Sequence, residues 1–361
     1  MQQVSADDMM WAMLVHFGAH MWYDLPCDPA RERKGIYGGI HDHHFFDYGV
    51  WCDWTQAMSR SGVNTLVVDV GEGVVYPSHP ELGIKGSWSA DRLHEEVVRL
   101  KKLGLEVIPK LNFSTTHDAW LGEYGHMIST PEYYKVRDDV IGDLVDIFEK
   151  PRLFHLGMDE ETAWHQPPGK QNYMCLRQGE LWWNDIELLF RRVESLGGRP
   201  WVWSDYIWHH KEEFLGRMPK SVMQSNWYYG SDKIDPKFHT SENSRLYTGA
   251  FQWLEDAGYD QIPCGSTWEK KENFPAIVEW GRTHVPAERL KGFLMTTWVL
   301  TVPQQREQGL KAIKIVADAR MNFERTGGCR RREAHHVQSS RRIRGTPCGQ
   351  EQGRGRAQGQ G

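Results

Sequence analysis

Short apolar runs alternate with helical segments along most of this 361-residue chain. Runs of this length, with apolar residues on both faces, are typical of buried parallel strands. The eight candidate strands cover residues 13–18, 64–70, 105–113, 153–156, 200–205, 221–229, 261–269 and 292–298. Strands and helices that alternate eight times over roughly 320 residues predict a (β/α)8 barrel. A doubly wound open sheet fits less well, because no GxGxxG turn follows the first strand.

Cap residues and helical spacing locate several of the helices between these strands. Residues 48–61 are expected to form one helix, and Ser89 is expected to cap another. Thr130 and Pro131 have the residue types that begin a third helix. A last helix is expected over about residues 304–323.

The composition changes after residue 326, where Arg, Gly and Gln replace almost all large apolar residues. A segment of this kind cannot bury a core. We therefore expect a catalytic barrel over residues 1–326 and a disordered basic tail over 327–361.

Charge and hydropathy restrict the partners of the chain. The formal net charge of −5 does not favour a nucleic-acid partner. No apolar segment reaches transmembrane length, so no membrane partner is expected. The first residues lack the features of a signal peptide, so the chain as written is expected to be cytoplasmic or a truncated secreted enzyme.

Three consecutive acids, Asp159, Glu160 and Glu161, follow the apolar run 153–156 through Gly157. Barrel enzymes carry their active sites at the C-terminal ends of strands, which is where these acids fall. If the strand continues, adjacent side chains point in opposite directions, so Asp159 and Glu160 need different roles. They are not the usual pair of carboxyl groups on either side of a glycosidic bond. The arrangement suits cleavage in which Glu160 is the general acid and Asp159 orients a nucleophilic acetamido group of the substrate.

The sequence resembles a known family at this motif. His155-Leu156-Gly157-Met158-Asp159-Glu160 is similar to the His-x-Gly-Gly-Asp-Glu signature of family 20 glycoside hydrolases, the β-N-acetylhexosaminidases. Segments around Asn112, Asp205 and Trp298 follow in the order of that family, and the resemblance covers most of residues 10–320. It implies a retaining, cofactor-free glycosidase that removes a terminal N-acetylated hexosamine from a β-glycoside.

The chain departs from the family pattern at several positions. Met158 replaces the second Gly of the signature, and Asn112 stands where the family has Asp. Val299 and Leu300 follow Trp298, where the family has Thr-Glu, and Trp268 lies in the region of the family's Tyr-Leu-Asp. These differences leave the sugar and the linkage open.

Further substrate-binding residues are expected at the ends of other strands. Aromatic rings stack on the CH faces of sugars, and polar side chains grip the hydroxyl groups. The aromatic candidates are Trp203, Trp227, Tyr229, Trp268 and Trp298, and the polar candidates are Glu72, Asn112, His117, His155, Asp205 and Glu269.

Two other functions remain open from the residues alone. In a conventional retaining glycosidase, Glu160 would be the acid/base and Glu269 the nucleophile. In a carbohydrate-binding barrel, the same pocket would bind sugar without cleaving it.

No metal or cofactor is predicted. The six Cys form no CxxC pair. The run His41-Asp42-His43-His44 has metal-ligating side chains, but no dispersed further ligand is recognisable in the sequence.

Overall fold

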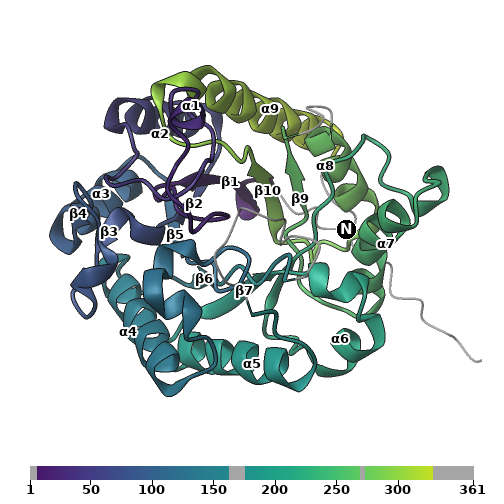
Figure 1. Cartoon of the computed structure of the whole chain (residues 1–361). Helices are drawn as coiled ribbons and strands as arrows, with labels where there is room; N and C mark the ends of the chain where they lie inside the picture. The colour runs from purple at the N-terminus through teal and green to yellow at the C-terminus, as the bar shows by residue number, and fades with distance from the viewer. Residues whose placement is uncertain (1–5, 162–174, 269–272, 328–361) are drawn as a thin grey trace, which may run out of the picture. The chain divides into compact units, whose positions relative to one another are not determined.

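The computed structural model describes residues 6–161, 175–268 and 273–327. Eight parallel strands of this part form one sheet in the order β8-β7-β6-β5-β2-β1-β10-β9. The two end strands meet through the bridges Gln224–Gln261 and Trp227–Cys264. The sheet thus closes into the predicted (β/α)8 barrel, and Figure 1 shows helices around the ring of strands.

The barrel strands coincide with the eight apolar runs, but most are shorter than the runs. They are β1 (Met10–His16), β2 (Thr65–Asp69), β5 (Glu106–Lys110), β6 (Leu153–His155), β7 (Arg199–Trp203), β8 (Met223–Ser225), β9 (Cys264–Ser266) and β10 (Gly292–Thr296). After β2, the short strands β3 (Val74–Val75) and β4 (Trp88–Ser89) pair in parallel. Several loops therefore leave the sheet before the apolar residues end.

The helices confirm the caps predicted from the sequence. Ser89 accepts the N–H of Arg92, and Thr130 accepts that of Tyr133. Periodicity did not single out α6, α7 and α8. The described helices are α1 (Pro29–Glu32), α2 (Tyr48–Ser61), α3 (Ala90–Lys102), α4 (Pro131–Ile147), α5 (Glu180–Ser195), α6 (Lys211–Arg217), α7 (Glu242–Asp256), α8 (Asn273–His284) and α9 (Arg306–Arg325).

The α9 helix ends just before the segment that was expected to be a tail. Of residues 327–361, only Gly327 is described, so the expectation of disorder falls outside the described residues. None of the described helices combines the length and hydropathy needed to cross a membrane.

The apolar side chains divide into two layers, which explains why the strands are apolar on both faces. On β1, Ala12 and Leu14 join the cluster inside the barrel, while Trp11 and Met13 join the cluster between strands and helices. Burial on both faces is the general condition of strands in parallel sheets.

The inner face becomes polar at the C-terminal ends of four neighbouring strands. His16, Asp69, Lys110 and His155 lie in one register and are buried. Lys110 Nζ lies 2.6 Å from Asp69 Oδ2, and His16 Nδ1 lies 3.3 Å from the same oxygen. Burial would raise the pKa of Asp69, but the charges and hydrogen bonds of Lys110 and His16 together outweigh it and lower that pKa. This paired layer separates the apolar interior of the barrel from the loops at its mouth.

Candidate active site

The chain turns sharply after β6, before it reaches the acids. Gly157, Met158 and Glu160 have left-handed φ angles of 70°, 71° and 57°. A Cβ at Gly157 would lie 2.0 Å from Asn112 Oδ1, so only glycine fits there. The acids are therefore not part of a strand, and the expectation that Asp159 and Glu160 point in opposite directions is wrong.

Both acids instead contact the same imidazole. His117 Nε2 lies 3.4 Å from Asp159 Oδ2 and 3.3 Å from Glu160 Oε2. Burial works against a charge on this ring, but the charge of Asp159 and hydrogen bonds to both carboxylates raise the pKa of His117 to about 10. This raised pKa favours a protonated ring between the two acidic side chains at neutral pH.

Asn112 holds Asp159 in place. Its Nδ2 donates to Asp159 Oδ1 at 2.7 Å, while its Oδ1 accepts the N–H groups of Ser114 and Met158 at 3.0 and 3.1 Å. The side chain of Asn112 positions an acid, and its predicted contact with the substrate stays a prediction. An Asp here would have no N–H to donate to Asp159, which gives a physical reason for the amide.

A third carboxyl group, that of Asp205, supports the turn from β7. Its Oδ2 accepts the main-chain N–H of Glu160 at 2.8 Å. Burial and then the charge of Asp159 raise the pKa of Asp205 well above its usual range. The side chain therefore tends to keep its proton beside the other two acids.

The third acid of the motif forms a buried ion network that sequence reasoning missed. Arg177 binds Glu161 through two N–H···O contacts of 2.8 Å and binds Asp185 Oδ2 at 2.8 Å. It also donates to the carbonyl oxygen of Phe113 at 2.6 Å. Arg177 and Asp185 are fully buried. No local pattern marks Arg177, because its partners lie on other segments of the chain.

Aromatic rings connect the acids to the opposite side of the barrel. Trp298 lies between Trp203 and Trp22, with ring centroids 6.1 and 5.9 Å away. Trp22 also lies 5.9 Å from the ring of His117 and 4.3 Å from that of Tyr37. Trp22 and Tyr37 were not among the predicted site residues, and only their position after the first strand could have indicated them.

Three aromatic candidates remain: Trp227 and Tyr229, which form a pair, and Trp268, which is exposed. Trp227 stacks on Tyr229 at 5.0 Å, and both pack in the inner cluster that contains Trp203. Trp268 is 56% exposed. Its predicted contact with a sugar stays a prediction.

Three polar candidates complete the predicted set. Glu72 is buried and accepts the N–H of Ala19 at 2.6 Å and that of His20 at 3.2 Å, so its carboxylate holds the loop after β1. His155 is buried in the polar layer, where burial and then the charge of Lys110 lower its pKa well below the usual value. Glu269 lies outside the described residues.

Several polar atoms around this site are buried without a hydrogen-bond partner among the described residues. They include Trp203 Nε1, Tyr37 Oη, Asp205 Oδ1 and His117 Nδ1. Buried polar atoms in folded proteins are nearly always hydrogen-bonded. These four atoms are exceptions to that rule, and they lie around the candidate site.

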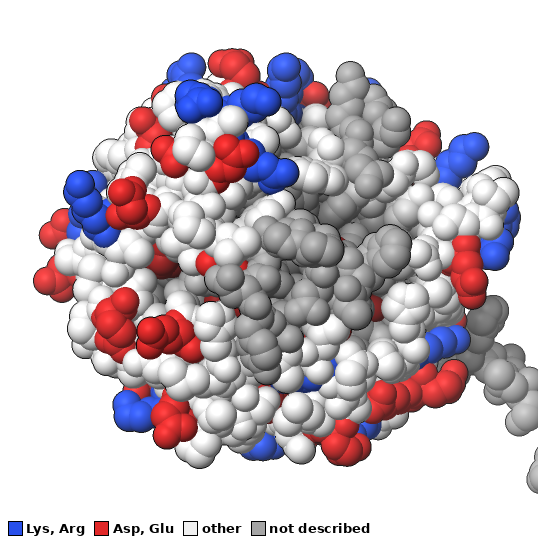
Figure 2. Space-filling view, in the orientation of Figure 1, with Lys and Arg blue, Asp and Glu red and all other residues white. Residues whose placement is uncertain are grey.

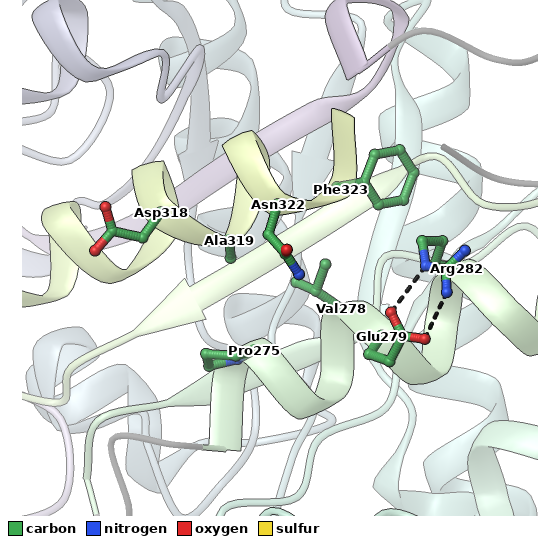
Figure 3. A pocket seen from close by; sticks show the side chains of 8 residues that line it. All are labelled: Pro275, Val278, Glu279, Arg282, Asp318, Ala319, Asn322 and Phe323. Carbon is green, nitrogen blue, oxygen red and sulfur yellow. Dashed lines mark hydrogen bonds and ion pairs between the residues drawn. The ribbon is translucent and has the colours of Figure 1, made fainter. Parts of the chain in front are cut away.

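On the loop after β2, the imidazole of His79 also contacts two carboxylates, those of Glu81 at 2.9 Å and Asp139 at 3.0 Å. A groove of about 220 Å³ runs between α8 and α9, where Glu279 and Arg282 pair with each other (Figure 3). On the face in Figure 2, positive and negative side chains mix around the rim. A mixed rim of this kind does not favour a polyanionic partner.

Asp118, next to His117, gives the site a testable pH dependence. Burial raises the pKa of Asp118 to about 7, so the folded state keeps a proton that the unfolded state loses near pH 4. The contribution of the protonated Asp118 to the free energy of unfolding is complete below about pH 4. It is lost as the pH rises through 7. This difference in pKa corresponds to a contribution to the free energy of unfolding on the order of 4 kcal/mol. Asp118→Asn should remove this dependence.

The test is urea unfolding of wild type and Asp118→Asn at several pH values from 4.5 to 8. The free energy of unfolding of wild type should fall relative to the variant as the pH rises. Parallel curves for the two proteins would contradict the raised pKa.

Comparisons with known proteins agree with the fold. No family model matches the sequence, and no curated protein matches it significantly. Among solved structures, the chain is similar to a family 20 exo-β-N-acetylglucosaminidase from Vibrio harveyi, with a TM-score of 0.58, 12% identity, and coverage of 91% of this chain and 55% of that one. That enzyme was solved in complex with N-acetylglucosamine.

Two other solved structures are similar to the same extent. Dispersin B has a TM-score of 0.54 and 14% identity, over 82% of this chain and 97% of that one. A Streptomyces plicatus β-hexosaminidase has a TM-score of 0.55 and 15% identity, over 86% of this chain and 63% of that one. The chain thus spans about half to nearly all of the length of these proteins. The similarity confirms a barrel fold like that of the family 20 hexosaminidases.

Proposed function

We propose that this chain is a glycosidase that removes a terminal 2-acetamido sugar from a β-glycoside. One observation carries the proposal: Asp159 and Glu160 contact the same imidazole, His117, at the C-terminal mouth of the barrel. Active sites of (β/α)8 enzymes lie at this end. The similarity to hexosaminidase structures supports the class of substrate.

Glu160 is assigned the role of general acid and base. Its side chain is 21% exposed, so it is reachable from the mouth. It protonates the glycosidic oxygen as the bond to the anomeric carbon breaks, and later takes a proton from the attacking water.

Asp159 is assigned to the acetamido group of the substrate. In this step the acetamido carbonyl oxygen attacks the anomeric carbon from the face opposite to the leaving group. Positive charge then develops on the acetamido group, and the adjacent carboxylate of Asp159 stabilises it. Asn112 fixes one oxygen of that carboxylate, so the orienting group is held in place before the substrate binds.

The aromatic rings and the unpartnered polar atoms suit a sugar ring. Ligand pockets are lined mainly by apolar and aromatic groups with a few polar atoms that fix orientation. Trp22, Trp203 and Trp298 provide such a lining next to His117. Trp203 Nε1 and Tyr37 Oη provide unsatisfied donors.

The proposal is tested with pairs of aryl β-glycosides that differ only in the 2-acetamido group. The glycoside with the 2-acetamido group should be hydrolysed. The glycoside with a hydroxyl in place of that group should not be turned over. A thiazoline analogue of the acetamido sugar should inhibit competitively. Equal turnover of both sugars, with a covalent 2-fluoro-sugar adduct on the protein, would instead support the conventional retaining mechanism.

Asp159→Asn should lower kcat by about 10²–10³, in the range found when a group that stabilises transition-state charge is removed. The weakened stabilisation should also reduce binding of the thiazoline. Asp318→Asn, at an exposed position on α9, is the control. It should change neither kcat nor the binding of the thiazoline. Wild-type turnover by Asp159→Asn would remove Asp159 from the mechanism.

A further inference from the structure

The loop between β1 and α2 brings together three side chains that bind metals in many proteins. One donor atom each from Cys27, Glu32 and His41 lies within 4.8 Å of the other two. His41 Nδ1 is 3.2 Å from Glu32 Oε2. The sequence drew attention to His41 and its neighbours, and the fold adds the two dispersed ligands that were not recognisable there.

The main chain of the loop fixes this arrangement. Pro26 and Ile40 form a parallel bridge, in which Cys27 N donates to the carbonyl oxygen of Ile40 at 2.9 Å. The two segments joined by this bridge approach so closely that a Cβ at Gly39 would lie 2.4 Å from the carbonyl oxygen of Leu25. Cys27 and His41 are therefore held next to each other by the backbone.

The short helix α1 supplies the third ligand. Asp28 caps this helix by accepting the N–H of Ala30 at 2.8 Å, and Pro29 occupies its first turn. The helix ends at Glu32, and this places the carboxylate of Glu32 next to the ring of His41. Glu32 is 37% exposed while the ring of His41 is buried, so an ion can enter from the side of the carboxylate.

The chemistry of these donors selects a class of metal. A thiolate, an imidazole and a carboxylate form a donor set that suits Zn²⁺ better than Mg²⁺ or Ca²⁺, which prefer oxygen. Zinc bonds of about 2.0–2.3 Å in a tetrahedron place the donor atoms roughly 3.3–3.7 Å apart. The distance of 3.2 Å between His41 Nδ1 and Glu32 Oε2 is close to that spacing, and the distances from these two residues to Cys27 are within 4.8 Å.

The charges near the cluster are mixed, because Glu32, Asp28 and Arg31 all act on Cys27. Asp28 and Asp42 lie next to two of the ligands in the sequence. The nearby guanidinium of Arg31 donates to Tyr23 Oη at 2.9 Å and to the carbonyl oxygen of Tyr37 at 3.1 Å, so it has other partners.

We propose that Cys27, Glu32 and His41 bind one Zn²⁺ ion, with a water molecule as the fourth ligand, and that the ion clamps the loop between β1 and α2. The same loop carries Trp22 and Tyr37, whose rings are 4.3 Å apart and reach the candidate active site. The ion would therefore stabilise the aromatic wall of the sugar pocket. This last consequence rests on the proposed glycosidase function, while the metal site does not.

The test uses the full chain, reduced and stripped of metal with a chelator, and titrated with Co²⁺. A thiolate bound to Co²⁺ gives an intense charge-transfer absorption, which should appear with one equivalent and disappear when Zn²⁺ is added. Cys27→Ser should abolish the band, and Glu32→Gln and His41→Ala should each weaken Co²⁺ binding at least 10-fold. The second metal-type cluster, His117 with Asp159 and Glu160, has no thiol and cannot give this band.

Matched controls separate this site from other ligands in the chain. Cys52→Ser and His43→Ala change the same residue types outside the cluster and should keep the band and the affinity. Circular dichroism should confirm that each variant is folded, and Glu32→Gln, at a partly exposed position, disturbs the fold least. Absence of the band in wild type, or its persistence in Cys27→Ser, would overturn the site.

A second measurement separates the metal site from the glycosidase proposal. Zn²⁺ should raise the Tm of wild type but not that of Cys27→Ser, whether or not any glycoside is hydrolysed. Binding without activity would refute the glycosidase alone. Activity with no metal-dependent change in absorption or Tm would refute the metal site alone.

Discussion

Glu160→Gln is expected to lower kcat by about 10²–10⁴, the usual contribution of a general acid. Gln has nearly the same shape as Glu but carries no transferable proton. The hydrogen bond from the main-chain N–H of Glu160 to Asp205 Oδ2 does not involve the side chain of Glu160. The turn after β6 should therefore persist in the variant. Because good leaving groups need little protonation, the loss should be largest for alkyl glycosides and smallest for activated aryl glycosides.

The measurement compares kcat of wild type and Glu160→Gln on both kinds of glycoside, with Tm as the check on folding. An unchanged Tm combined with selective loss on alkyl glycosides identifies a proton donor. Full activity of Glu160→Gln on alkyl glycosides would mean that another group donates the proton. If neither protein hydrolyses any glycoside but both bind the sugar, the chain is a carbohydrate-binding barrel.

Arg177→Met is expected to reduce the free energy of unfolding by about 3–5 kcal/mol, as is typical when one partner of a buried ion pair is removed. The variant leaves the carboxylates of Glu161 and Asp185 buried without their cation. Since Glu161 follows Glu160 directly, activity should fall as well.

Arg217→Met is the matched control, because Arg217 pairs with Glu180 and Glu187 at a 30% exposed position. Exposed ion pairs contribute at most about 1 kcal/mol, so its effect should be small. Urea unfolding of both variants provides the comparison. If Arg177→Met cost no more than Arg217→Met, the network would not hold the acidic turn.

A rescue experiment refines this result. Adding Glu161→Gln and Asp185→Asn to Arg177→Met removes the uncompensated charges and should recover part of the lost stability. Asp185 also accepts hydrogen bonds from Ser129 at Oδ2 and from Tyr134 at Oδ1, at 2.7 and 2.6 Å. The single amide oxygen of Asn keeps only one of these two bonds, so the recovery should be partial.

The fold was predictable from the sequence because its signals are local. A strand buried on both faces needs an apolar run, and a helix start needs a cap within a few residues of its first turn. Ser89 and Thr130 have this role as predicted. The helices α6, α7 and α8 were not singled out, so the prediction of eight repeats rested on the strands.

Part of the candidate site was also predictable, because a barrel gathers the C-terminal ends of its strands at one mouth. Asp159, Glu160 and His117 were all selected from positions at strand ends, and the structure brings them into contact. Trp203 and Trp298 likewise lie near each other. Their roles in catalysis and binding remain proposals.

The direction and pairing of side chains were decided by the tertiary structure alone. Whether Asp159 and Glu160 diverge or converge depends on where β6 ends. Gly157 has a left-handed φ there, and Asn112 on another segment leaves no room for a side chain at this position. The partner of Glu161 lies at Arg177, and that of His41 at Glu32. The sequence by itself determined which residues are apolar, acidic or cap-forming, because those are properties of single residues and their neighbours. Which charges meet depends on distances between remote segments, which only the folded chain fixes.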